Sequence, residues 1–249
     1  MTLLPLSLGI ARLESRPQRS RSAQKSGADT IPAPEGLSYM MGKHLPKGLK
    51  EEIIERDRKT CQYCGFKADK YQNVHHIDHN LTNIEKSNLA TACVFCHQCF
   101  HIDQVGDMES GTLIWLPEIE QHELHNIARA VYVGRISQGD IAEASRKVYE
   151  IFLSRRAAAI DRISTDNPYI MATVMRDYLS LGAYKARDKK LDGIRLLPLD
   201  KRMVQEAELK FNQFPQILAY WRSKNGPFGG KAPAEWVSIT QDILAKNAA

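Results

Sequence analysis

The stretch "CQYCGFKADKYQNVHHIDHNLTNIEKSNLATACVFCHQCFH", residues 61–101, contains all five cysteines of the chain and five of its eight histidines. Four of the cysteines form two pairs with C-x-x-C spacing, and 28 residues separate the pairs. A C-x-x-C turn presents both sulfurs to one ion, and two such turns complete a tetrahedron of thiolates around Zn²⁺. The sequence therefore predicts a structural zinc ion held by Cys61, Cys64, Cys93 and Cys96.

The predicted zinc site also indicates what the ion does and where the protein works. Four cysteines leave no coordination position open, so the ion is expected to stabilise the fold and to take no part in a reaction. Thiolates kept for a metal are typical of a reducing compartment, which indicates the cytoplasm. Cys99 continues the three-residue spacing after Cys96. We predict a small buried residue there, with replacement of one of the four ligands as the alternative.

The composition is that of a soluble globular protein. The 249 residues suffice for one large or two small domains, and the hydrophobic content of 43% and charged content of 25% are ordinary. No apolar run approaches the roughly 18–20 residues needed to span a bilayer. The start of the chain lacks a basic segment before its apolar residues, so we do not expect a secretory signal.

The net charge of +5 belongs to the first 50 residues, which carry eight basic and three acidic side chains. The remaining 199 residues hold 26 basic and 26 acidic side chains, a balance of zero. A protein that grips a phosphate backbone usually gathers Lys and Arg near its site, because release of counterions supplies much of the affinity. The charge distribution therefore argues against nucleic acid as the main partner.

The chain divides into three parts by composition. Residues 1–48 are predicted to be a flexible basic arm, because residues 11–36 are rich in Arg, Ser, Pro, Ala and Gly. Residues 49–110 form the Cys/His module, and residues 111–249 a mainly helical domain that we expect to bind a partner. The expected fold class is α+β.

Apolar spacing and turn residues predict the elements outside the cysteine region. Ser137 with Asp140 resembles a capping box, and Asn167 is a predicted helix cap. The predicted elements are a helix from about 49, a strand over 111–116, a helix that Pro117 opens, a helix over 138–163, a helix over 167–184, a charged connector over 185–200, a helix over 203–223 broken at Pro215, and a last helix over 232–247.

The histidines between the cysteine pairs lie in "NVHHIDHN", followed by Asn88-Leu89 and a predicted helix that opens with C-x-x-C-H. Over about residues 56–101 this order resembles the HNH (ββα-metal) endonuclease fold. The resemblance implies that His76 is the general base, that Asn88 orients it, and that His75 and His97 hold a divalent ion such as Mg²⁺, Mn²⁺ or Ni²⁺. His101, four residues after His97, would be a third ligand on the same helical face.

The chain departs from the HNH pattern in two ways. The family usually has a proline shortly after HHI, whereas this chain reads "HHIDHN", and few basic residues flank the site. The alternative is that the histidines belong to a reused scaffold without activity. No partner pattern includes His79, His122 or His125, so we predict no site role for them.

The stretches "ERDRKTCQYCGFKADKYQNV", "NLATACVFCHQCF" and "GTLIWLPEIEQHELHNIARAVYV" together resemble the IcmJ/DotN family of type IVB (Dot/Icm) secretion systems. The resemblance implies a zinc-stabilised, HNH-like adaptor that binds the C-terminal extension of the coupling ATPase, beside other adaptors of the coupling complex. Such a subunit would reach the cytoplasmic face of the inner membrane through its partner, without inserting into the bilayer. Nucleic acid would be a partner only under the alternative, a metal-dependent endonuclease.

Aromatic residues near the end of the chain offer a possible partner surface, although core packing is the simpler interpretation for any single one of them. They are Phe211, Phe214, Tyr220, Trp221, Phe228 and Trp236.

Overall fold

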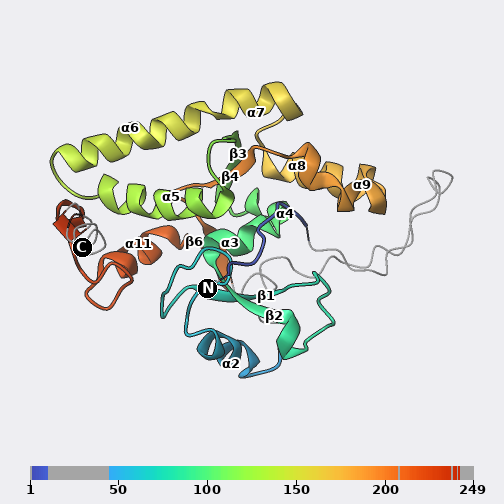
Figure 1. Ribbon diagram of the computed structural model, residues 1–249, viewed down its shortest axis with the longest axis horizontal. Coiled ribbons are helices and arrows are strands. Elements are labelled where there is room, and N and C mark those ends of the chain that lie inside the picture. The colour runs from blue at the N-terminus through green and yellow to red at the C-terminus, as the bar shows by residue number, and fades with distance from the viewer. Residues whose placement is uncertain (1, 11–44, 207, 237, 240, 242–249) are drawn as a thin grey trace.

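The computed structural model describes residues 2–10, 45–206, 208–236, 238–239 and 241. It has the predicted α+β class, with a small Cys/His module followed by a mainly helical part (Figure 1). The module consists of helix α2 (Leu49–Arg56), strand β1 (Gln72–His76), the 3₁₀ turn η1 (Lys86–Asn88), strand β2 (Leu89–Cys93), and the short helices α3 (Val94–Cys99) and α4 (Ile102–Val105).

Strands β1 and β2 form the hairpin that the resemblance to the HNH (ββα-metal) fold implies. They pair antiparallel, with Gln72 opposite Cys93 and His75 opposite Ala90, and all residues of both strands are buried. Helix α2 covers one side of the hairpin through Ile53, which is buried with Val74 and Leu89. This register places the His-His pair at the end of β1 and the second cysteine pair where β2 passes into α3.

The helical part begins with strand β3 (Gly111–Trp115), which pairs antiparallel with β4 (Ile194–Pro198). Helices α5 (Gln121–Arg135) and α6 (Asp140–Ser154) lie side by side, with α5 against β4, and α8 (Pro168–Thr173) and α9 (Leu181–Lys185) lie on the right of the view (Figure 1). The remaining elements are α7 (Arg156–Ile163), the π-helical turn η2 (Val174–Tyr178), α10 (Arg187–Lys190), β5 (Met203–Glu206), β6 (Leu209–Asn212) and α11 (Phe214–Arg222). None of the helices described here combines the length and the apolar content needed to cross a membrane.

Two of the predicted elements are wrong. The predicted helix over 203–223 is instead a hairpin of β5 and β6 followed by α11, with Pro215 in the first turn of that helix. The predicted connector over 185–200 contains α10 and β4. Strand β4 escapes prediction because its partner β3 lies about 80 residues earlier in the chain, and no local signal reports such a pairing.

Helices α5 and α6 do not begin at the residues that the sequence predicted, Pro117 and Ser137. Helix α5 begins after Glu120, whose backbone N–H donates to the Glu123 carboxylate at 2.7 Å, so Pro117 lies outside the helix. Ser137 donates to the carbonyl of Val133 and does not cap α6, which begins after a glycine with positive φ. The predicted helix over 138–163 is two helices, α6 and α7, and the predicted helix over 167–184 is divided into α8, η2 and α9. Asn167 caps α8 as predicted, accepting from the N–H of Tyr169 at 2.9 Å.

The first residues of the chain pack against the protein, so the prediction of a flexible arm over 1–48 is wrong for residues 2–10. The N–H of Gly9 donates to the Cys99 carbonyl at 2.8 Å, and the Gly9 carbonyl accepts from Ile102. Leu8 and Ile10 are buried in a cluster with residues of β3 and α8. Apolar residues alternate along this segment, so one side of it is buried. The prediction failed because it was based on the Arg- and Ser-rich composition of the residues that follow. Residues 11–44 of the predicted arm lie outside the described residues, whereas Leu45 is buried in a cluster with Ile53 of α2, so the prediction is wrong there as well.

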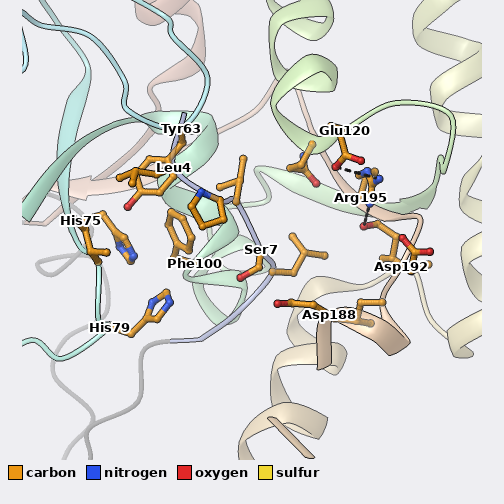
Figure 2. Close-up of a pocket in the computed structure, with 17 residues that line it drawn as sticks. Leu4, Ser7, Tyr63, His75, His79, Phe100, Glu120, Asp188, Asp192 and Arg195 are labelled. Atoms are coloured by element: carbon orange, nitrogen blue, oxygen red, sulfur yellow. Dashed lines mark hydrogen bonds and ion pairs between the residues drawn. The ribbon is translucent and has the colours of Figure 1, made fainter. Parts of the chain in front are cut away.

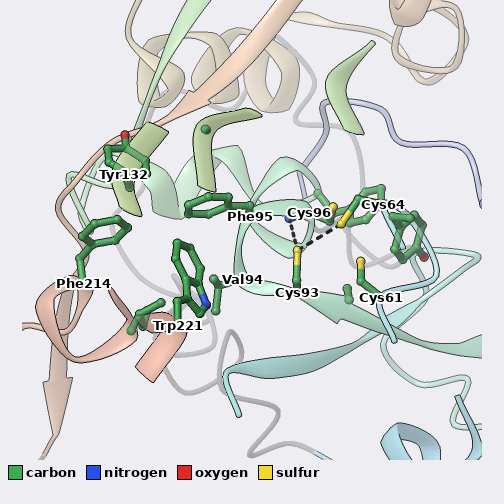
Figure 3. Close-up of a cluster of buried hydrophobic side chains, with 14 of the residues drawn as sticks. Cys61, Cys64, Cys93, Val94, Phe95, Cys96, Tyr132, Phe214 and Trp221 are labelled. Carbon is green, nitrogen blue, oxygen red and sulfur yellow. Dashed lines mark hydrogen bonds between the residues drawn. The ribbon is translucent and has the colours of Figure 1, made fainter. Parts of the chain in front are cut away.

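One hydrophobic cluster joins the module to the helical part. It contains the four cysteines, Phe95, Tyr132 of α5, and Phe214 and Trp221 of α11 (Figure 3). Two of the terminal aromatic residues are therefore core residues, as the simpler interpretation expected. Of the predicted last helix, residues 233–236 are helical, and several of its later residues lie outside the described ranges.

Candidate metal centre

Two tight turns bring the four cysteines together. In the first, the N–H of Gly65 donates to the Cys61 carbonyl and the N–H of Cys61 donates to the Phe66 carbonyl, both at 2.9 Å. Gly65 has a φ of 73°, a conformation that glycine adopts without strain. In the second, Cys93 precedes α3, and its sulfur accepts from the N–H of Cys96 at 3.4 Å. Both turns aim their sulfurs at the same point.

The sulfur quartet, Cys61, Cys64, Cys93 and Cys96, has the geometry of a metal site. The four sulfurs lie within 4.8 Å of one another, and all four cysteines are buried and free of disulfides. The sulfurs of Cys64 and Cys93 are 3.7 Å apart. Tetrahedral coordination with metal–sulfur bonds of about 2.3 Å requires sulfur–sulfur distances of about 3.8 Å, whereas a disulfide would need about 2.05 Å. The quartet can therefore hold one tetrahedral ion, as Figure 3 illustrates.

Helix α5 contributes two polar side chains to the quartet: Arg129, which no sequence pattern singled out, and His125, for which the prediction of no site role is wrong. Nη2 of Arg129 lies 2.7 Å from the sulfur of Cys93, and Nδ1 of His125 lies 3.2 Å from that of Cys96. Burial alone would lower the pKa of Arg129, but the sulfurs of Cys93 and Cys64 raise it above its ordinary value. The sequence signal that could have identified Arg129 is its place among the buried positions of an amphipathic helix, because a buried charge needs a partner.

Cys99 lies beside the quartet but outside it. Its sulfur is 3.6 Å from the carbonyl of Phe95 and 3.8 Å from Nε2 of His125. Burial raises the pKa of the Cys99 thiol well above its ordinary value. This placement matches the expected small buried residue.

A second cluster of candidate ligands is the histidine triad, His75 of β1, His97 of α3 and His101. One ring nitrogen from each lies within 4.8 Å of the others, and all three side chains are buried. Helix α3 ends at Cys99, so His101 stands beyond it and not on the same helical face, although the His97 and His101 rings are only 4.6 Å apart. Within the described ranges, both ring nitrogens of His75 and Nδ1 of His97 are buried without a hydrogen-bond partner.

The triad can therefore accept an ion through neutral imidazoles. Burial lowers the pKa of His75 and of His97 well below the ordinary value, and the neighbouring His101 adds to the effect on both. Neutral imidazole is the form of histidine that binds a metal. The His75 ring also stacks on Phe100, with ring centroids 3.8 Å apart, which holds it in one orientation.

His76 and Asn88 do not join the triad. Successive side chains of a strand point to opposite faces, so His76 points away from His75. Burial lowers its pKa, and Asp78 opposes that shift. Asn88 exchanges two hydrogen bonds with Asp78, at 3.0 and 2.8 Å, and its carbonyl accepts from Ile77. Asn88 thus fastens the turn that follows His76.

The face of His75 opens on a cavity of about 370 Å³ between the module and the helical part. The N-terminal residues Leu4 to Leu8 form one wall, and His79 and Phe100 form another (Figure 2). The charged lining consists of Glu120, Asp188, Asp192 and Arg195, in which Arg195 pairs with Glu120 at 3.6 Å. His79, for which no site role was predicted, thus lines this cavity, whereas His122 does not.

Comparisons with known proteins agree with this architecture. The profile of the HNH endonuclease family matches residues 61–102, which run from the first cysteine to the residue after His101. The type 4 apparatus protein DotN of Legionella pneumophila is 34% identical over 166 residues, a match that covers 65% of this chain and 77% of that protein. The match to DotN extends well beyond the HNH segment. The chain therefore belongs to the IcmJ/DotN family of type IV secretion proteins and carries an HNH-like module.

Proposed function

We propose that the protein is an adaptor of the coupling complex of a type IVB secretion system, with zinc in the sulfur quartet. In this role it binds the C-terminal extension of the coupling ATPase and sits beside other adaptors at the cytoplasmic face of the inner membrane. The similarity to DotN, which spans both the module and the helical part, supports the secretion role. The closed quartet supports a scaffold, because four thiolates leave the ion no position for a substrate.

The observation that carries the adaptor function is the covering of the histidine triad. His75, His97 and His101 are only 1–2% exposed, and the cavity that His75 lines is walled by the chain's own N-terminal residues. Three carboxylates and one arginine supply the charge of that cavity. The major groove of a DNA duplex alone is about 12 Å wide, and the duplex carries roughly one negative charge per 1.7 Å of its axis. Neither the space nor the charge suits a phosphate backbone.

A binding measurement tests the adaptor function. The purified full-length chain is titrated with the C-terminal extension of the coupling ATPase from the same organism in a calorimeter. We expect saturable binding in the micromolar range or tighter, and no binding of an unrelated peptide with the same length and charge. Absence of heat at 100 μM of both partners, with the chain shown to be folded and zinc-loaded, would refute the proposal.

The histidine triad favours one second candidate, a metal-dependent HNH endonuclease with His76 as general base. The three converging imidazoles and the unpartnered nitrogens of His75 fit a divalent ion. Plasmid nicking with Mg²⁺, Mn²⁺ or Ni²⁺ decides between the functions, with His76→Ala as the test variant and His122→Ala as the control. The adaptor function predicts no cutting by any of the three proteins. Cutting that His76→Ala abolishes and His122→Ala retains would establish the nuclease.

The metal content of the purified chain is a second, independent test between the adaptor and the nuclease. Elemental analysis of the purified chain is expected to find one zinc per molecule, which the quartet holds. A second bound ion that His75→Ala removes would place a metal in the triad and favour the nuclease. Absence of any transition metal would refute the zinc assignment itself.

A further inference from the structure

Helix α5 contributes two buried polar side chains to the sulfur quartet, although it lies outside the HNH-matching segment. His125 and Arg129 are four residues apart, so they stand on the same face of the helix, and they are 0% and 1% exposed. The match to the HNH family ends at residue 102. The two side chains therefore reach the quartet from outside the segment that carries its four cysteines.

Arg129 directs its guanidinium at two of the sulfurs. Nη2 lies 2.7 Å from the sulfur of Cys93 and 3.6 Å from that of Cys64. The group lies over the ring of Phe66, at 4.0 Å from its centroid, and Nη1 donates to the side chain of Asn126 at 2.8 Å. Among the described residues, no carboxylate forms an ion pair with Arg129. The sulfurs are therefore the counter-charge of this buried cation.

A chain of hydrogen bonds determines which nitrogen of His125 carries its proton. Gln121 exchanges two bonds with the backbone of Leu196: its Nε2 donates to the carbonyl and its Oε1 accepts from the N–H, both at 2.8 Å. This pairing fixes the orientation of the amide. The same Nε2 lies 2.8 Å from Nε2 of His125, so that ring nitrogen accepts. The proton of the neutral ring is then on Nδ1, which donates to the sulfur of Cys96 at 3.2 Å.

The charges of the site explain why two such donors are needed. Four thiolates and one Zn²⁺ carry a net charge of −2, and a buried net charge is unfavourable unless it is paired and hydrogen-bonded. Arg129 supplies one positive charge, and His125 supplies a donor to a third sulfur. Donors to bound thiolates also orient the ligands and tune the metal.

We propose that α5 is the outer half of the zinc centre: Arg129 and His125 compensate and orient the thiolates, and the zinc in return fastens α5 to the module. The inference rests on zinc in the quartet but not on the adaptor function. Arg129 and His125 are positioning residues, since they act on the ion through the sulfurs. Loss of zinc would consequently loosen the helical part as well as the module.

The first experiment measures the metal site in the full-length chain. Arg129→Met removes the charge and keeps the length. Arg135→Met is the control, since Arg135 lies on the same helix, has a side chain that is 24% exposed, and pairs with Asp200. We expect zinc release to a colorimetric chelator to be about tenfold to 100-fold faster in Arg129→Met than in the wild type. The Arg135→Met protein should release zinc at the wild-type rate. In cobalt-substituted protein, the sulfur-to-cobalt charge-transfer band should move only in Arg129→Met and His125→Asn.

The second experiment uses the wild-type chain and so does not depend on the variants folding. Hydrogen exchange is compared before and after zinc is removed with a chelator. We expect the amides of α5 to lose protection together with those of α3. Continued protection of α5 after zinc loss, or equal release rates and unchanged cobalt spectra in the variants, would overturn the proposal. A chain that contains no metal would instead refute the zinc assignment.

Discussion

Substitution of Cys93 by serine removes the sulfur on which most contacts of the quartet converge. This sulfur is 3.7 Å from that of Cys64, accepts from the N–H of Cys96, and lies 2.7 Å from Nη2 of Arg129. A serine hydroxyl has no negative charge at neutral pH and is a poor ligand for zinc. We expect the variant to lose the metal.

Two contributions determine how much folding free energy the Cys93→Ser substitution should remove. Bound zinc contributes on the order of 10 kcal/mol to the folding of small metal domains. The buried guanidinium of Arg129 would also lose its nearest counter-charge, which costs about 3–5 kcal/mol when one partner of a buried pair is removed. The net stability of a folded domain is about 5–15 kcal/mol. Either term alone is large against that stability, so Cys93→Ser should abolish the cooperative melting of the module.

Cys99→Ser is the matched control, because Cys99 is buried nearby and its sulfur lies outside the quartet. We expect this variant to retain one zinc and to melt within about 2–4 °C of the wild type, which corresponds to about 1 kcal/mol. Zinc content and thermal melting, each with and without chelator, are measured for both variants. A Cys93→Ser protein with bound zinc and a native melt, or a Cys99→Ser protein without zinc, would contradict the assigned ligands.

Three further substitutions test the packing, with urea unfolding as the measurement. Ile10→Ala should lower the free energy of unfolding by about 2–5 kcal/mol, because Ile10 is buried against β3 and α8; an unchanged midpoint would show that the N-terminal residues do not pack. Trp221→Ala should cost about 3–5 kcal/mol, since its ring is buried and meets Phe95 edge-on. Gly226→Ala would place a Cβ 2.0 Å from the carbonyl oxygen of Tyr220 and should cost at least about 1–3 kcal/mol. Gly182→Ala, which meets no atom within 4 Å, is its control and should be neutral or stabilising.

Local spacing explains what could be predicted. Each C-x-x-C pair and helix α3 depend on residues a few positions apart, whereas the hairpin that carries the two adjacent histidines was implied by the resemblance to the HNH fold; the structure contains all of them. The resemblance to the HNH fold also implied the histidine triad, although α3 ends before His101. The resemblance to the IcmJ/DotN family, carried by short stretches on both sides of residue 110, agrees with the comparison to DotN.

Long-range pairing explains what could not be predicted. The β4 strand pairs with β3, the N-terminal residues pack on α3, α4 and the helical part, and neither partner is close in sequence. Arg129 and His125 looked like ordinary positions of an amphipathic helix. Only the packing of α5 on the quartet gives them a role, because a charge or an imidazole becomes a donor to a thiolate when the fold brings it within about 3 Å. The sequence by itself determined the sulfurs that can hold the ion, whereas the tertiary structure decided which groups surround them.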